Sequence, residues 1–124
     1  MPYIKANDGR RASLRIGDVA KNAGELNYQI FYYTKHLPDF HHSIDYKSAI
    51  KIFVDNFLCA DGKPNYQKWN DMTGALIRCS IEIYRRLPNY VWEVASYLPD
   101  LMRSYDKQIA DYEDEKIISN GDVE

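Results

Sequence analysis

The sequence predicts a single all-α domain of four or five helices packed as a bundle. Apolar residues recur three or four positions apart over long stretches, which is the period of one helix face. Segments rich in proline and glycine separate these stretches, and no stretch alternates apolar and polar residues as a half-buried strand does. A chain of 124 residues that is 45% hydrophobic has the size and composition of one domain. We therefore expect one domain, 1–124, with flexible tails at 1–12 and 119–124.

The first helix is predicted to begin between residues 13 and 18 and to run to His36, with Leu26, Ile30 and Tyr33 on its core stripe. It ends at "HLPDFHHS", because the residue before a proline is disfavoured in helical geometry. A second helix is predicted over 45–60, with a broad apolar face. It stops at "ADGKPN", whose residues are typical of turns.

The third helix, predicted over 66–87, has the most regular pattern. Asn65 precedes it as a predicted N-cap. Spacings of three and four residues give it a continuous apolar seam, made of Trp69, Met72, Leu76, Cys79, Ile83 and Leu87.

The region 88–118 continues with apolar residues at heptad-like spacing, from Val91 and Val94 to Tyr112. Pro99 lies inside it and is expected to kink or split the helix there. This long C-terminal region is expected to extend beyond the bundle. Its packing against a second copy, giving a homo-oligomer, is a hypothesis.

Charge and cysteine content narrow the function classes. The net charge is −2, so the chain has no basic excess to bind a phosphate backbone, and a nucleic-acid role has no support from charge. Cys59 and Cys79 lie in apolar contexts and are expected to be reduced core residues. The N-terminal residues lack the apolar core of a secretory signal, and no apolar run has the ~20 residues of a membrane span. We expect a soluble cytoplasmic protein.

No catalytic or metal-binding motif stands out. His41 and His42 are adjacent and cannot by themselves converge on one ion, and no HExxH or CxxC spacing occurs. The glycines are scattered and form no phosphate-binding loop. We expect no metal and no cofactor, and an enzyme is less expected than a binding protein.

Two carboxylates still merit attention, Glu25 in the first helix and Glu82 in the third. Facing each other across a bundle, they could hold Mg²⁺ or act as acid and base. The favoured interpretation is that they pair with Arg78, Arg85 or Arg86 as structural contacts. The same "YRR" segment at 84–86 could instead receive an anionic ligand, because arginine forks suit phosphate and carboxylate.

Three segments together resemble a family of short uncharacterised phage, prophage and bacterial proteins. These segments are "AGELNYQI" at 23–30, "WNDMTGALIRCSIEIYRR" at 69–86 and "YEDEKIISNGDVE" at 112–124. The family carries a GELNY helix, a glycine-containing helix ending in E-[FI]-YRR, and YED-K-I-x-NGDV. The matching residues include Glu25, Asn27, Tyr28, Glu82, Arg85, Arg86 and Tyr112.

The chain departs from the family pattern in two places. A helix-length insertion, residues 87–110, separates YRR from YED, and Glu124 stands where the family usually has an aromatic residue. The resemblance implies a phage or prophage origin and a small helical fold, and it carries no established activity. If a phage encodes the chain, the expected compartment is the host cytoplasm. It also implies a shared polar cluster of Glu25, Asn27, Tyr28, Glu82, Arg85 and Arg86, with Tyr112 added by the third motif.

Three functional hypotheses follow. The leading one is a small non-enzymatic accessory protein that binds a host or viral protein, based on a tyrosine-rich surface and amphipathic helices; an inhibitor of host defence is one version. The second is a helical protein that binds or hydrolyses a nucleotide or phosphate ligand through Glu25, Glu82, Arg85 and Arg86. The third is a structural component of a virion or assembly, with the C-terminal helix self-associating.

Overall fold

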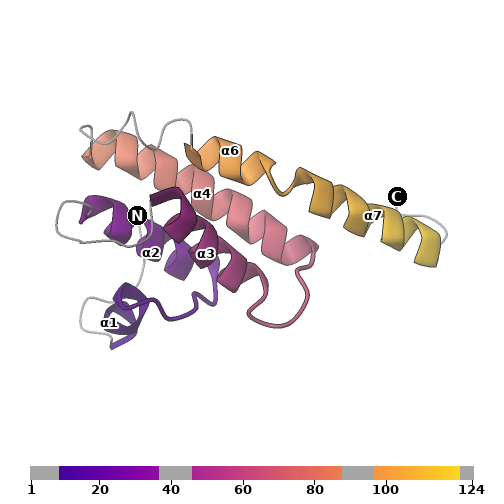
Figure 1. Cartoon of the computed structure of the whole chain (residues 1–124), viewed down its shortest axis with the longest axis horizontal. Coiled ribbons are helices and arrows are strands. Elements are labelled where there is room, and N and C mark those ends of the chain that lie inside the picture. The colour runs from indigo at the N-terminus through magenta and orange to yellow at the C-terminus, as the bar shows by residue number, and fades with distance from the viewer. Residues whose placement is uncertain (1–8, 37–45, 88–96, 121–124) are drawn as a thin grey trace.

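The computed structural model describes residues 9–36, 46–87 and 97–120, which contain six helices (Figure 1). Their bounds are α1 Gly9–Arg15, α2 Ala23–Lys35, α3 Tyr46–Leu58, α4 Tyr66–Arg86, α6 Tyr97–Arg103 and α7 Asp106–Asn120. The expected tails at 1–8 and 121–124, and the apolar positions Val91 and Val94, lie outside the described residues.

Helix α4 is the centre of the packing. It contacts α2 most extensively and also packs against α3 and α6, while α1 packs on α2 (Figure 1). These five helices form one domain, and the described residues contain no strand. The predicted all-α fold is confirmed.

The predicted first helix is two helices. The chain leaves α1 at Gly17, whose φ of 103° lies in the left-handed region that favours glycine. The amides of Gly17 and Asp18 donate to the carbonyls of Leu14 and Ser13 and close the turn. Helix α2 then restarts at its N-cap, where the Asn22 side chain accepts from the Glu25 amide at 2.9 Å. Residues 9–12, expected to belong to a tail, are therefore the first half of α1.

The middle of the chain follows the predictions closely. Helix α3 differs from the predicted 45–60 by one and two residues at its ends, and α4 from 66–87 by one residue. The Asn65 side chain accepts from the Lys68 amide at 2.9 Å and so caps α4 as expected.

The kink or split predicted at Pro99 stays a prediction, because residues 88–96, which precede α6, lie outside the described residues. Pro99 lies in the first turn of α6, where a proline is tolerated because the amide it lacks would have no partner within the helix. Within the described residues, the C-terminal region is interrupted at Ser104, whose hydroxyl donates to the Leu101 carbonyl at 2.6 Å. Helix α7 begins two residues later and runs through Ser119 and Asn120, which were expected to belong to the C-terminal tail.

The core is built around the predicted seam of α4. Five of its six members are buried: Trp69, Met72, Leu76, Cys79 and Ile83. They pack with buried side chains of α2, α3 and α6, including Leu26, Ile30, Ile50, Val54, Phe57, Leu98 and Leu101.

The two cysteines differ in burial. Both are free, as expected. Cys79 lies in the core, and burial raises the pKa of its thiol, which disfavours the reactive thiolate. Cys59 is exposed, so the prediction that it is a core residue is wrong; it follows the last residue of α3 and turns outward with the loop.

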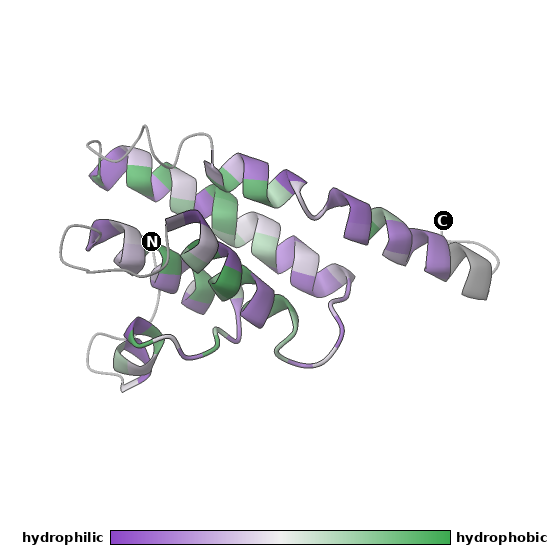
Figure 2. Cartoon of the chain, in the orientation of Figure 1, coloured by the Kyte–Doolittle hydropathy of each residue, from purple (hydrophilic) through white to green (hydrophobic). Residues whose placement is uncertain are grey.

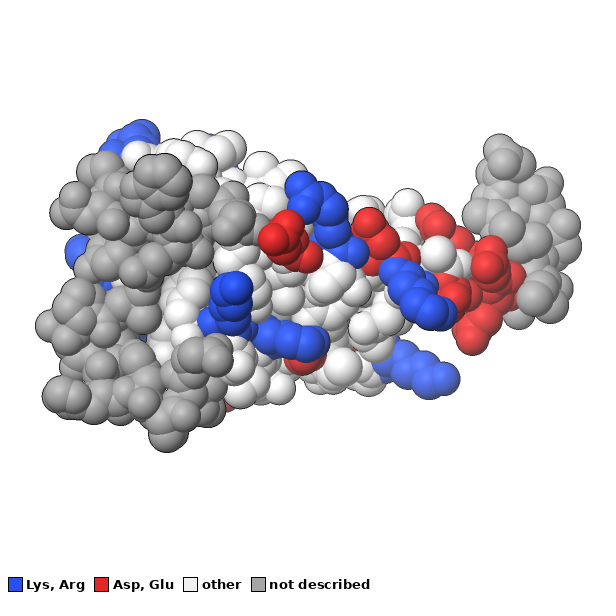
Figure 3. Space-filling view, turned by 45° about the horizontal axis from the view of Figure 1, so that its top comes forward, with Lys and Arg blue, Asp and Glu red and all other residues white. Residues whose placement is uncertain are grey.

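Helix α7 extends away from the body of the molecule (Figure 1). It is largely hydrophilic (Figure 2), and carboxylate side chains gather over it (Figure 3). Near its N-terminal end, Ile109 and Tyr112 pack against the core, with the Tyr112 ring edge-on to Trp69 at 5.2 Å. None of the described helices has the length and apolar character needed to cross a membrane.

Gly74 is expected to reduce the stability of α4. It is exposed in the helix interior, and a Cβ added there would meet nothing within 4 Å. Because glycine is less favourable than alanine inside a helix, Gly74→Ala should raise the free energy of unfolding by about 0.5–1 kcal/mol. Urea denaturation of both proteins would measure this change. A loss of stability would show that space at Gly74 is needed.

Candidate functional site

The predicted polar cluster does not assemble as one group. Glu25 binds Arg10 of α1 instead of the arginines of α4. The Arg10 guanidinium donates to both carboxylate oxygens, from Nε at 2.9 Å and from Nη2 at 2.7 Å. The Lys21 amide adds a third hydrogen bond at 2.9 Å. The expected pairing of Glu25 with Arg78, Arg85 or Arg86 is therefore wrong, because α1 folds back onto the start of α2.

Glu82 pairs within its own helix. Arg85 donates to its carboxylate at 2.9 Å, and Arg86 lies 3.9 Å from the same oxygen. The hydrogen bond from Arg85 lowers the pKa of the buried Glu82 carboxyl, and burial opposes that shift. For Glu82 the predicted structural pairing is confirmed.

Two further predicted residues are packing positions. Asn27 is buried in α2, and its Oδ1 has no hydrogen-bond partner among the described residues. Tyr112 packs on Trp69. The tyrosine-rich surface expected from composition is also reduced, because only Tyr66 and Tyr84 of the described tyrosines are exposed.

Tyr28 and Arg86 do come together, in a pocket that the sequence reasoning missed. We call it the cationic pocket; its volume is about 230 Å³. It lies between α1, α2 and the C-terminal end of α4, and is lined by Arg11, Arg15, Tyr28, Phe31, Tyr32, Lys35, His36 and Arg86. These lining residues include three arginines and one lysine, and none of them is a carboxylate.

The aromatic rings of the cationic pocket hold its guanidinium groups. The Arg15 guanidinium lies 4.8 Å from the centre of the Tyr32 ring, and its Nε donates to the Tyr28 hydroxyl at 2.6 Å. The Arg86 guanidinium lies 4.9 Å from the centre of the Phe31 ring. Such contacts attract a cation to a ring face and restrict its orientations.

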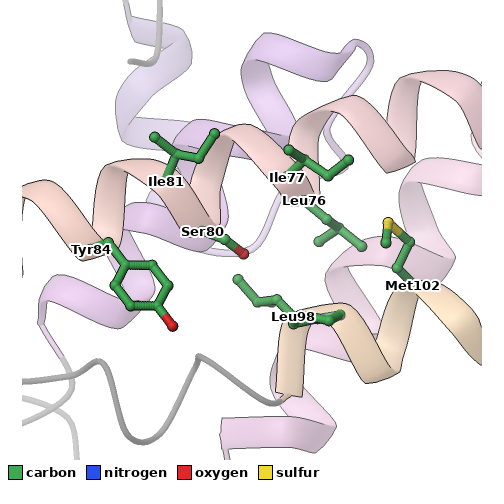
Figure 4. A pocket seen from close by; sticks show the side chains of 8 residues that line it. Leu76, Ile77, Ser80, Ile81, Tyr84, Leu98 and Met102 are labelled. Atoms are coloured by element: carbon green, nitrogen blue, oxygen red, sulfur yellow. The ribbon is translucent and has the colours of Figure 1, made fainter.

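A second concave surface lies between α4 and α6. We call it the apolar groove; its volume is about 180 Å³. Figure 4 shows its walls, with Leu76, Ile77, Ser80, Ile81 and Tyr84 from α4 and Leu98 and Met102 from α6, and Pro99 completes the lining. Ser80 contributes the one hydroxyl besides that of Tyr84, so the surface is almost entirely hydrocarbon.

Three large side chains of the apolar groove remain half exposed. The exposed fractions are 48% for Ile77, 48% for Ile81 and 52% for Tyr84. Their spacing of four and three residues puts them on one stripe of α4, beside the buried seam. This second stripe is visible in the sequence, and the spacing rule that located the seam could have found it.

The described residues contain no group of three or more His, Cys, Asp or Glu side chains that could hold a metal ion. His41 and His42 lie outside the described residues.

The motif-based resemblance to short phage and bacterial proteins remains a prediction. Comparison of the chain with protein-family models, with curated proteins and with solved structures finds no significant match.

Proposed function

We propose that this chain is a small helical interaction protein that binds a partner protein through the apolar groove. The observation that carries the proposal is the stripe of half-exposed side chains, Ile77, Ile81 and Tyr84, along one wall of that groove. These side chains offer a partner hydrocarbon surface that binding would remove from water.

The shape of the apolar groove favours an elongated apolar partner segment. Two helices form its walls, and the exposed side chains recur along one of them. An amphipathic partner helix would place its own apolar face against this stripe, and burial would remove hydrocarbon from water on both sides. Tyr84 adds an amphipathic aromatic side chain, a residue type enriched where binding energy concentrates.

The motif resemblance supplies the class of partner that we propose. If the chain is of phage or prophage origin, the partner is a host or viral protein, and a component of a host defence system is one specific case. The carboxylates weaken the alternative of a hydrolase based on Glu25 and Glu82, since each is held by its own arginine.

A charge placed in the apolar groove should abolish partner binding. Ile81→Asp would put a carboxylate into a surface that loses its water when the partner binds. Desolvation of that carboxylate would weaken binding by a few kcal/mol. Tagged wild-type protein and variant would be incubated with bacterial lysate, and the retained proteins compared by quantitative mass spectrometry. Any protein retained by the wild type should then be purified, and its binding measured directly by calorimetry.

Ile52→Asp is the matched control. Ile52 is a half-exposed isoleucine of α3 that does not line the groove. The same specific protein should bind the wild type and Ile52→Asp, and should be lost with Ile81→Asp. Equal recovery by all three proteins would contradict the proposal, as would recovery of no specific protein. Light scattering on the same samples tests whether the partner is instead a second copy of this chain.

A further inference from the structure

The cationic pocket concentrates side chains of positive charge. Arg11, Arg15, Lys35 and Arg86 all line it, and none of its described lining residues is acidic. Glu82 lies 3.9 Å from Arg86 and offsets part of this charge, whereas Glu25 binds Arg10, which does not line the pocket. Several cations that line one small volume repel each other, and a bound anion would relieve that repulsion.

The arginines are held in place before any ligand arrives. Arg15 uses Nε to reach the Tyr28 hydroxyl, and its guanidinium lies over the Tyr32 ring. Ring contacts likewise position Arg86 on Phe31 and Arg11 near Tyr28, at 4.9 Å and 5.4 Å. A guanidinium already fixed by a ring loses less freedom when it binds an oxyanion, which improves affinity.

Arg11 lines the cationic pocket and carries an unsatisfied donor. Its Nε is buried and has no hydrogen-bond partner among the described residues. A buried donor left unpaired is unfavourable, and such groups are rare in folded proteins. A bound anion that draws the Arg11 guanidinium into the pocket would satisfy this donor.

From these observations we propose that the cationic pocket binds the phosphate end of a small phosphorylated molecule. Phosphate oxygens suit the planar arginine fork, and a diphosphate offers more charge to the four cations than a monophosphate does. The volume of about 230 Å³ lies below the ~300–1,000 Å³ of pockets that enclose a whole drug-sized ligand. The pocket therefore takes the phosphates, and the remainder of the ligand lies outside it.

This site is separate from the groove proposed for protein binding. The cationic pocket is lined by α1, α2 and the end of α4, and shares no lining residue with the apolar groove. Either proposal can fail while the other holds.

The test is calorimetric titration of the full chain with pyrophosphate, inorganic phosphate, ADP and adenosine. Pyrophosphate and ADP should bind, phosphate more weakly, and adenosine not measurably. Tighter binding of ADP than of pyrophosphate would identify a nucleotide as the ligand source, and equal binding would identify the diphosphate alone. Binding should weaken as salt is raised from about 0.05 to 0.15 M, since the contacts are ionic.

Variants make the test specific to the cationic pocket. Arg15 and Lys35 are exposed side chains that line it, so Arg15→Gln and Lys35→Gln should leave the fold intact, as judged by circular dichroism. Each should weaken pyrophosphate binding by about tenfold or more, the effect of one charge-assisted contact. Arg103→Gln is the control, since Arg103 pairs with Asp100 on α6 and does not line the pocket.

Three results would overturn the proposal. These are no binding of pyrophosphate or ADP by the wild type, binding of adenosine as tight as that of ADP, and unchanged affinity in the folded Arg15→Gln and Lys35→Gln variants. A loss in Arg103→Gln equal to that in Arg15→Gln would also overturn it, because the effect would then reflect overall charge.

Discussion

Replacing Ile83 with alanine is expected to lower the free energy of unfolding by about 2–5 kcal/mol. Ile83 is fully buried in the seam of α4, the helix that contacts α2, α3 and α6. Truncation removes three carbon atoms from the core and leaves a cavity that the surrounding helices can fill only in part. Since a small domain is stable by about 5–15 kcal/mol, this single change removes a large share of the total.

Ile81→Ala is the control for that experiment. It is the same substitution two residues earlier in the same helix, at a side chain that is 48% exposed. Helix propensity changes equally in both variants, so the difference between them reports burial alone. Chemical denaturation should show a loss below about 1 kcal/mol for Ile81→Ala. Equal losses in the two variants would contradict the orientation of α4 in the fold.

The sequence predicted the elements whose signals are local. The seam of α4 repeats over six positions, Asn65 provides its cap, and the glycine and proline residues of "ADGKPN" end α3, so the bounds of α3 and α4 came within one or two residues. The same repeat predicted that Cys79 is buried, as the structure shows. In each case the residue pattern and the packing favour the same structure.

The sequence did not show where α1 ends and how it packs. The polar segment 9–15 has little apolar periodicity, and its place on α2 depends on contacts between distant residues. The Gln29 side chain donates to the carbonyls of Leu14 and Asp18 at 2.9 and 2.8 Å, which fastens the turn after α1 to α2. No local pattern in the sequence indicates such contacts. For the same reason the cationic pocket, which takes two of its arginines from α1, could not be assembled from the sequence.

The motif residues illustrate the same limit. A motif indicates which residues matter together without indicating which of them touch. Glu25 and Arg86 both occur in the motifs, yet Glu25 faces Arg10 and Arg86 lies over Phe31. Residue spacing within one helix correctly placed Glu82 beside Arg85 and Arg86, because those contacts span only three and four positions.

Arg10→Gln is expected to lower the free energy of unfolding by about 1–3 kcal/mol at neutral pH. Arg10 joins α1 to α2 through Glu25, and also contacts Ser13, Asp18 and the Val19 carbonyl. The exposed fractions of the Arg10 and Glu25 side chains are 20% and 13%. Removing Arg10 leaves a largely buried carboxylate without its cation. The expected loss of stability is below the ~3–5 kcal/mol of a fully buried pair, because some water reaches both groups.

The same variant should alter how stability depends on pH. The hydrogen bonds from Arg10 lower the pKa of the Glu25 carboxyl below its ordinary value, against the opposing effect of burial. A carboxyl whose pKa is lower in the folded state stabilises the protein above the unfolded value of ~4.3, and that contribution is lost as pH falls through the folded pKa. The deficit of Arg10→Gln relative to wild type should therefore be largest at neutral pH and should shrink below about pH 4.

Denaturation of wild type, Arg10→Gln and Arg103→Gln between pH 7 and pH 3 would measure this difference. Arg103 and Asp100 are both about two-thirds exposed, and exposed pairs contribute only about 0–1 kcal/mol, so Arg103→Gln should follow the wild-type curve. Glu82 also has a lowered pKa and contributes acid sensitivity to all three proteins, so it cancels in the comparison. A deficit for Arg10→Gln that stays constant down to pH 3 would mean that Arg10 stabilises α1 through its hydrogen bonds to the uncharged Ser13 hydroxyl and Val19 carbonyl, and not through the charge of Glu25.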